Sequence, residues 1–190
     1  HKHNDHCYGI FDLVRTRSLD NLPLTVHANQ TTRDTLMQAF PSCFKPEWPY
    51  VQFEPWQRGE HIHLDGVTIE GLETHHYPDI ETTAFLLEFH DGDVTTRVVY
   101  ATDMGTDMPS PVKRLVDVDL FIGDGTYLGG PGKGHPGTDR VIEMGEDISA
   151  GCTVITHVGH WGITAAEAEA RLGPDVAICR DGDDVASFLP

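Results

Sequence analysis

The chain has 190 residues, 39% of them hydrophobic, which is enough for one domain with a sizeable core and too little for two ordinary domains. Thirty acidic residues against 13 basic ones give a formal net charge of −17, which disfavours long nucleic acids and anionic membranes as partners. No run of about 18 apolar residues occurs, so we expect no membrane span. Four scattered cysteines without a CxxC pair indicate reduced thiols in a cytoplasmic protein.

Hydrophobic strands that alternate with helical segments predict an α/β fold with helices packed on a sheet. In chain order, the first half predicts a helix over 9–15, a strand over 24–27, a helix over 32–40, an ordered loop over 43–57, and strands over 61–64, 67–72, 83–90 and 96–101. The second half predicts a helix over 111–116, a strand over 119–122, a helix over 138–150, a strand over 152–156, a helix over 164–172 and a strand over 176–179. Asp-Gly pairs at 65–66 and 91–92 predict hairpin turns, and Thr164 with Glu167 forms a capping box before a stop at Gly173.

Three of the predicted strands are followed closely by a polar residue. Asp103 follows the strand over 96–101, Asp124 follows the strand over 119–122, and His157 follows the strand over 152–156. Ligand sites in such folds gather beyond the carboxyl ends of the strands, so we expect these three side chains to converge.

The first six residues, His-Lys-His-Asn-Asp-His, hold four potential metal ligands. In an extended segment His1 and His3 point to the same side, so both can reach one ion. A turn into the following helix then directs Asp5 and His6 at a second ion. Imidazoles with a carboxylate suit zinc, with manganese or iron as alternatives.

This HxHxDH pattern resembles the signature of the metallo-β-lactamase superfamily. Later elements of that signature are also present, as Leu72-Glu73-Thr74-His75-His76, Tyr100-Ala101-Thr102-Asp103 and Val154-Ile155-Thr156-His157. The layout is most similar to the branch that contains tRNase Z-like enzymes and small cyclic-phosphate phosphodiesterases. The resemblance implies an αββα sandwich that forms a single domain over residues 1–190. Members normally have several strands before this motif, so we expect an N-terminal portion to be missing.

The resemblance implies a site with two divalent metal ions, zinc being favoured. His1, His3 and His76 would bind one ion, Asp5, His6 and His157 would bind the other, and Asp103 would bridge both. Either His75 or His76 is the ligand, and the branch pattern favours His76. Dimers are common in the superfamily, so a homodimer is also expected as a possible assembly.

Further histidines and one aspartate are candidates around the metals. His135 precedes a helix in Gly-His-Pro-Gly and is expected to bind phosphate or protonate the leaving oxygen. Asp124 is expected to orient a ligand or His135, and His160 and His75 are expected near substrate. We assign catalytic roles to Asp5, Asp103 and His135. His61 and His63 are interpreted as strand surface, because no nearby Cys or Asp completes a site.

The leading hypothesis is a phosphodiesterase for a small or cyclic phosphate ester, in which a hydroxide bridging the metals is the nucleophile. One alternative is hydrolysis of carbonyl esters, lactones or thioesters by the same metal site. The other alternative is a non-catalytic metal-binding module that retains the fold. Fold alone does not name the substrate.

Overall fold

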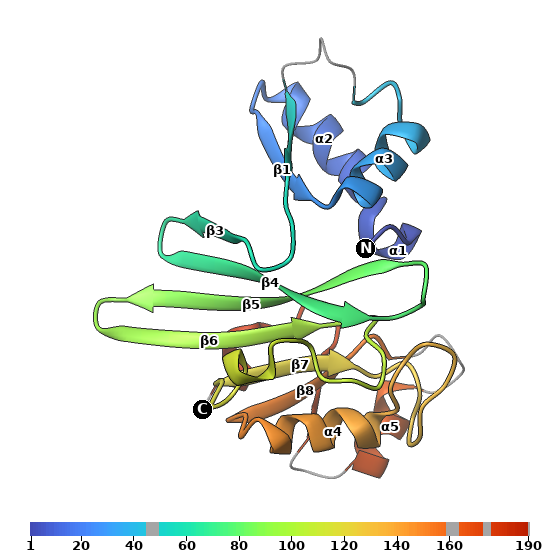
Figure 1. Cartoon of the computed structure of the whole chain (residues 1–190), viewed down its shortest axis with the longest axis vertical. Coiled ribbons are helices and arrows are strands. Elements are labelled where there is room, and N and C mark those ends of the chain that lie inside the picture. Colours follow the sequence, from blue (N-terminus) through green and yellow to red (C-terminus); the bar gives the residue numbers. More distant parts are fainter. Residues whose placement is uncertain (45–49, 159–163, 173–175, 190) are drawn as a thin grey trace. The chain divides into compact units, whose positions relative to one another are not determined.

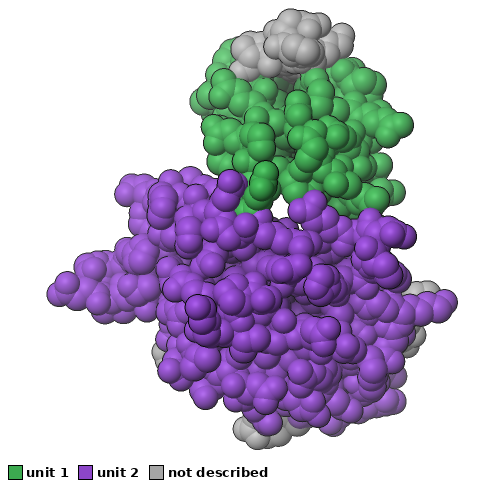
Figure 2. All heavy atoms as spheres, in the orientation of Figure 1, with its two compact units in different colours: residues 1–57 green, residues 58–190 purple. Residues whose placement is uncertain are grey.

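A computed structural model describes residues 1–44, 50–158, 164–172 and 176–189 of the chain. The chain divides into two compact units, His1–Gln57 and Arg58–Pro190, which are coloured green and purple in Figure 2. Each unit contains a hydrophobic cluster of its own. The expectation of one domain over residues 1–190 stays a prediction.

The His1–Gln57 unit is a small α/β layer. Its elements are α1 (Asn4–Cys7), α2 (Ile10–Leu19), β1 (Leu24–Ala28), α3 (Gln30–Ala39) and β2 (Val51–Pro55). β1 and β2 pair in parallel, and Val14 of α2 and Leu36 of α3 are buried together with Cys43 and Phe44. The prediction of a loop over 43–57 is wrong at β2, because pairing with β1 makes a strand there, while residues 45–49 lie outside the described chain.

The Arg58–Pro190 unit contains one large sheet with helices (Figure 1). Its strands are β3 (His61–Leu64), β4 (Val67–His75), β5 (Glu81–Asp91), β6 (Val94–Ala101), β7 (Leu120–Asp124), β8 (Cys152–Thr156) and β9 (Ala177–Ile178). Its helices are η1 (Val112–Arg114), α4 (Thr138–Asp147), α5 (Ala165–Leu172) and η2 (Val185–Phe188). The helix expected over 111–116 is only a short 3-10 turn, η1, because the segment makes three-residue hydrogen bonds such as Leu115 N–H to Val112 O.

The seven strands lie in sequence order from β3 to β9. The first four form an antiparallel meander, whose turns contain Gly66 and Gly92 in the left-handed region, as the Asp-Gly pairs predict. From β6 onward the pairs β6–β7, β7–β8 and β8–β9 are parallel. The carboxyl ends of β6, β7 and β8 therefore meet at the same edge of the sheet.

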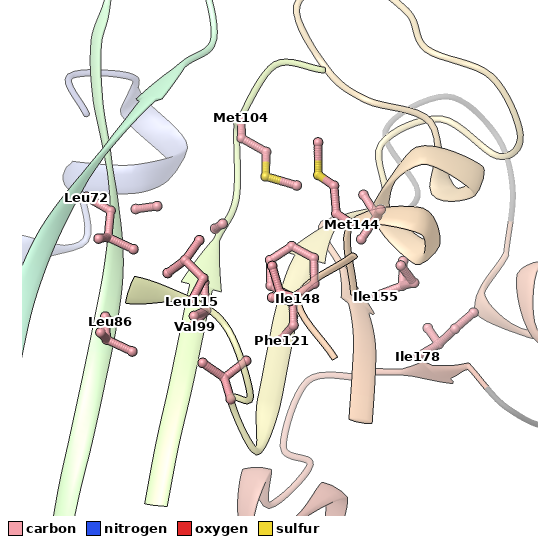
Figure 3. Packing of buried hydrophobic residues seen from close by; sticks show 14 of the residues in the cluster. Leu72, Leu86, Val99, Met104, Leu115, Phe121, Met144, Ile148, Ile155 and Ile178 are labelled. Atoms are coloured by element: carbon pink, nitrogen blue, oxygen red, sulfur yellow. The ribbon is translucent and has the colours of Figure 1, made fainter. Parts of the chain in front are cut away.

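Successive side chains of a strand point to opposite faces of the sheet, and each face of this sheet carries a hydrophobic cluster. On one face Leu86, Val99 and Phe121 pack with Met144 and Ile148 from the α4 segment, and Figure 3 shows Phe121 and Ile148 close together. On the other face the neighbours of these strand residues form a second cluster, which contains Val98, Leu120, Ile122 and Val154. The strands are thus held from both sides, and their carboxyl ends present side chains from a rigid frame.

The N-terminal cap of α5 is the one that the sequence predicts. The Thr164 hydroxyl and N–H donate to Glu167 Oε2 at 2.9 and 2.8 Å, and the Glu167 N–H donates to the Thr164 hydroxyl at 3.2 Å. The expected capping box is therefore confirmed, whereas the stop at Gly173 lies outside the described residues. Within the part of the chain that the structure describes, no helix has the length and apolar character needed to cross a bilayer.

Candidate metal centre

The Arg58–Pro190 unit brings four predicted site residues to one edge of its sheet. Asp103 follows β6, Asp124 is the last residue of β7, and His157 follows β8. β4 runs in the same direction as β6, because both are antiparallel to β5, and His76 therefore emerges at the same edge. The expected convergence of Asp103, Asp124 and His157 is confirmed, since their ligand atoms lie with one of His135 within 4.8 Å of one another.

Asp103 lies at the centre of this group, and its carboxylate is buried. Its Oδ1 is 3.3 Å from His157 Nε2 and 3.5 Å from His135 Nδ1. Its Oδ2 is 3.7 Å from His76 Nε2. The two oxygens of one carboxylate thus face different imidazoles, which is the arrangement needed for a carboxylate that bridges two cations.

The hydrogen bonds of His76 determine which of its nitrogens is available. Its Nδ1 is 2.9 Å from the carbonyl oxygen of Gly134, and a carbonyl only accepts, so Nδ1 carries the proton. In the neutral ring, Nε2 then presents its lone pair on the side of Asp103. This is the form in which histidine binds a metal, with its other nitrogen bound to a backbone carbonyl.

His157 is oriented in the same way through Thr126. The Thr126 hydroxyl donates to Asp124 Oδ1 at 2.7 Å, so its oxygen accepts from His157 Nδ1, also at 2.7 Å. Nε2 of His157 therefore directs a lone pair at the Asp103 carboxylate. Lone pairs of two imidazoles that face one anionic carboxylate repel it unless a cation lies between them, so these residues fit a divalent metal ion.

Asp124 is the fully buried anion behind these histidines. Its Oδ2 accepts from His135 Nδ1 at 2.6 Å, and its Oδ1 accepts from the Thr126 N–H at 2.9 Å. Burial raises the pKa of Asp124, but the hydrogen bonds from His135, His157 and Thr126 outweigh it and hold the pKa well below the ordinary value. Asp124 therefore stays ionised at neutral pH and orients both histidines, as the sequence leads us to expect for His135.

Two of the converging residues have unusual backbone conformations. Asp103 has φ +48° and His157 has φ +60°, both in the left-handed region that residues other than glycine seldom adopt. Such strain costs of order 1–3 kcal/mol per residue and is concentrated at functional sites. Both residues lie just beyond the carboxyl end of a strand, after β6 and β8.

A cavity of about 420 Å³ opens beside the histidines. It is lined by His76 and His135, by the segment Gly105–Asp107 and by residues of the 131–134 loop. His75 lies at this cavity too, but 70% of its side chain is exposed and its Nε2 is 3.7 Å from Glu73. The structure thus places His76 beside Asp103 and His75 at the rim, while their roles stay predictions.

In the His1–Gln57 unit, the residues of the N-terminal motif also lie together. The ring centroid of His1 is 4.5 Å from that of His3 and 4.4 Å from that of His6. His3 has extended backbone angles and immediately precedes α1, which contains Asp5 and His6. Asp5 Oδ2 is 3.6 Å from His6 Nε2. The assignment of these four side chains to particular ions stays a prediction.

Sequence reasoning missed Thr126. Thr126 connects Asp124 to His157, and the signal available for it was the Asp-Gly-Thr turn that follows β7. The carbonyl of Gly134, which orients His76, carries no side-chain signal at all. His160 lies outside the described residues.

Replacing Thr126 with Val is expected to weaken metal binding by roughly 10–100-fold, the usual cost of losing an outer-shell partner of a ligating histidine. The isosteric side chain keeps the packing but leaves His157 Nδ1 without its acceptor. The apparent Kd for Zn²⁺, measured by competition with a chromogenic chelator, tests this. Thr25→Val, at an exposed threonine on β1, is the matched control, and equal affinities of both variants would contradict the proposed link.

The fold and the His/Asp centre place this protein in the class of metal-binding α/β proteins whose site lies at the edge of a sheet. Comparison with known proteins then identifies its family. The model of the beta-lactamase superfamily domain family matches residues 1–158. The chain therefore belongs to the metallo-β-lactamase superfamily, a superfamily of hydrolases, as its motif indicates.

Solved structures of this superfamily share the fold. A diphosphatase of the PhnP family superimposes with a TM-score of 0.75 at 21% identity, over 96% of this chain and 66% of the other. Zn²⁺-bound PqqB from Methylobacterium extorquens superimposes with a TM-score of 0.66 at 17% identity, over 96% of this chain and 67% of the other. These likenesses confirm the predicted metallo-β-lactamase fold and, at such identities, establish the fold alone.

One curated relative is an uncharacterized protein of Synechocystis (sll0514). It is 31% identical over 103 residues, which are 54% of this chain and 17% of that protein. The chain thus spans less than a fifth of this relative and just under two thirds of the PhnP-family diphosphatase.

Proposed function

We propose that this protein is a dinuclear metal-dependent phosphodiesterase that acts on a small or cyclic phosphate ester. The proposal rests mainly on the carboxylate of Asp103, whose two oxygens face Nε2 of His76 and Nε2 of His157. Superfamily membership adds the remaining ligands of the motif, so the proposal includes His1, His3, Asp5 and His6 as further ligands. Zinc is the favoured ion, because imidazole and carboxylate ligands suit it.

Two bound divalent ions would lower the pKa of water and neutralise the oxygens of the phosphate that is attacked. Around them, the chain's own residues have separate tasks. Asp124 and Thr126 hold the imidazole of His157 in its metal-binding tautomer, and the carbonyl of Gly134 does the same for His76. Asp103 is buried, so its carboxylate is shielded from bulk water, and this strengthens its attraction for cations.

His135 supports the choice of a phosphate ester over other esters. Its Nδ1 donates to the carboxylate of Asp124, which fixes the orientation of the ring, and the ring also borders the cavity. An imidazole held at that position can bind a phosphate oxygen or pass a proton to a leaving alkoxide. An ester of a small alcohol fits a cavity of about 420 Å³, whereas a long nucleic acid is disfavoured by the net charge of −17.

The test is a substrate panel for the metal-loaded protein: bis(p-nitrophenyl) phosphate, a 2′,3′-cyclic nucleotide, a lactone and a thioester. We expect turnover of the phosphodiesters and its loss in Asp103→Ala. Turnover of only the lactone or thioester would retain the metal centre and reject the phosphodiesterase. Full metal occupancy without turnover of any member of the panel would favour a non-catalytic metal-binding module.

A further inference from the structure

A row of histidines crosses the sheet at the end opposite to the candidate metal centre. His61 and His63 belong to β3, and His90 belongs to β5. His63 pairs with Thr68 at the start of β4, while His76 follows the end of β4. At about 3.3 Å per residue, the eight residue steps from Thr68 to His76 place the row roughly 25 Å from the site at the carboxyl ends.

His61 and His63 are exposed and project from the same face of β3, because residues two apart in a strand share a face. Their rings are nearly parallel, with an interplanar angle of 10° and centroids 6.1 Å apart. An ion lies about 2.0–2.1 Å from each imidazole nitrogen that binds it, so two imidazoles on one ion have centroids separated by roughly 5–6 Å. The observed separation is close to this range, and the exposed side chain of His61 can change χ2 to turn its ring toward an ion bound by Nε2 of His63.

Side chains of the neighbouring strands β4 and β5 orient the ring of His63 for binding an ion. Its Nδ1 is 3.3 Å from the hydroxyl of Thr68, and the same hydroxyl is 3.3 Å from Nε2 of His90. Nδ1 of His90 in turn is 3.2 Å from the hydroxyl of Thr95. This row of side chains orients the ring of His63 through Nδ1 and leaves its Nε2 for a ligand.

The electrostatic surroundings favour a cation at this position. The N–H of His90 donates to the carbonyl of Gly66 at 2.8 Å, which brings the turn with Asp65 beside the turn that contains Asp91 and Asp93. Glu70, which pairs with His61 across the strands, is already engaged by Arg114 at 2.9 Å and so does not hold the histidine. The acidic turns and the net charge of −17 attract divalent cations from solution.

We propose that His61 and His63 chelate a divalent transition-metal ion at the surface of β3, separately from the ions of the candidate metal centre. Water completes the coordination of this ion. Imidazole ligands follow the Irving–Williams order, so Cu²⁺ binds more tightly than Zn²⁺ or Ni²⁺. The site is built by sheet pairing, since Thr68 lies opposite His63 in the β3–β4 hairpin and His90 comes from β5, 22 residues after Thr68 in sequence.

Titration of the protein with Cu²⁺, followed by calorimetry and by the nitrogen hyperfine pattern in electron paramagnetic resonance, tests the proposal. Wild type is expected to bind one more Cu²⁺ than either His61→Ala or His63→Ala at the same free concentration. Each variant is expected to lose roughly tenfold or more in affinity for that ion, because a single imidazole lacks the effective concentration of a chelate.

The matched control is His27→Ala, which removes a histidine of β1 in the other unit. This variant is expected to bind as many Cu²⁺ ions as wild type, and Asp103→Asn is expected to keep the ion at β3 while losing ions elsewhere. Equal stoichiometry and affinity in wild type, His61→Ala and His63→Ala would overturn the site. Because the comparison is between variants of β3, this result does not depend on whether the protein is a phosphodiesterase.

Discussion

Replacing Asp103 with Asn is expected to lower kcat/KM for bis(p-nitrophenyl) phosphate by more than about 100-fold, since losing only an outer-shell partner of a metal ligand already costs roughly 10–100-fold. The amide keeps the size and the left-handed backbone of Asp103, at φ +48°. It removes the negative charge that faces His76 and His157, at 3.7 and 3.3 Å. Metal content by elemental analysis is expected to fall together with turnover.

The stability of the variant separates a lost ligand from a damaged fold. An amide N–H₂ can donate to an imidazole lone pair, so the metal-free variant is expected to unfold at a temperature no lower than metal-free wild type. In the presence of Zn²⁺, wild type is expected to gain stability by ligand linkage and the variant to gain much less. Differential scanning fluorimetry with and without a chelator measures both quantities.

Asp117→Asn is the matched control for this substitution. Asp117 also has a left-handed backbone, at φ +57°, but it is exposed and lies outside the cluster of ligands. This variant is expected to retain wild-type turnover and metal content. An Asp103→Asn protein that kept its metal ions and its activity would reject the bridging role of the carboxylate.

Replacing His135 with Ala is expected to reduce kcat by about 10²–10⁴-fold on esters with poor leaving groups, the usual contribution of a general acid. The reason is its position, with Nδ1 held by Asp124 at 2.6 Å and its ring at the border of the cavity. A p-nitrophenolate leaving group needs little protonation, so turnover of bis(p-nitrophenyl) phosphate is expected to fall much less. The dependence of kcat on the pKa of the leaving group across a series of aryl and alkyl phosphodiesters measures this difference.

His75→Ala provides the comparison, because His75 borders the same cavity without a buried aspartate behind it. We expect its effect on kcat to be small and to be the same for good and poor leaving groups. If His135→Ala lowered the turnover of all esters equally, His135 would act in binding or in support of the metals, and its role as proton donor would be wrong. Metal content of the variant distinguishes those two remaining roles.

Much of the site was predictable from the chain alone. The HxHxDH motif, with its later His, Asp and His, identified the superfamily, because the superfamily's signature combines these residue types in this order along the chain. Strand ends were also predictable, since buried strands leave continuous apolar runs before Asp103, Asp124 and His157. Those three side chains converge because β6, β7 and β8 are parallel neighbours.

Several local features depended on partners distant in sequence. The sequence over β2 predicts a loop, but the segment is a strand, because it makes backbone hydrogen bonds with β1. The segment over 111–116 has a helical pattern but makes only the 3-10 turn η1. Local propensity is weak at such positions, and tertiary pairing decides their structure.

The sequence by itself determined the chemistry available to this protein: which residues can bind metal, in what order, and therefore the superfamily. Only the tertiary structure decided how these residues are oriented, through the Thr126 hydroxyl, the Gly134 carbonyl and the buried anion of Asp124. It also placed His90 beside His63 across the sheet, through Thr68. The physical reason is that hydrogen bonds to backbone carbonyls and between strands depend on which segments become neighbours in the folded chain. Residue type alone does not determine which segments those are.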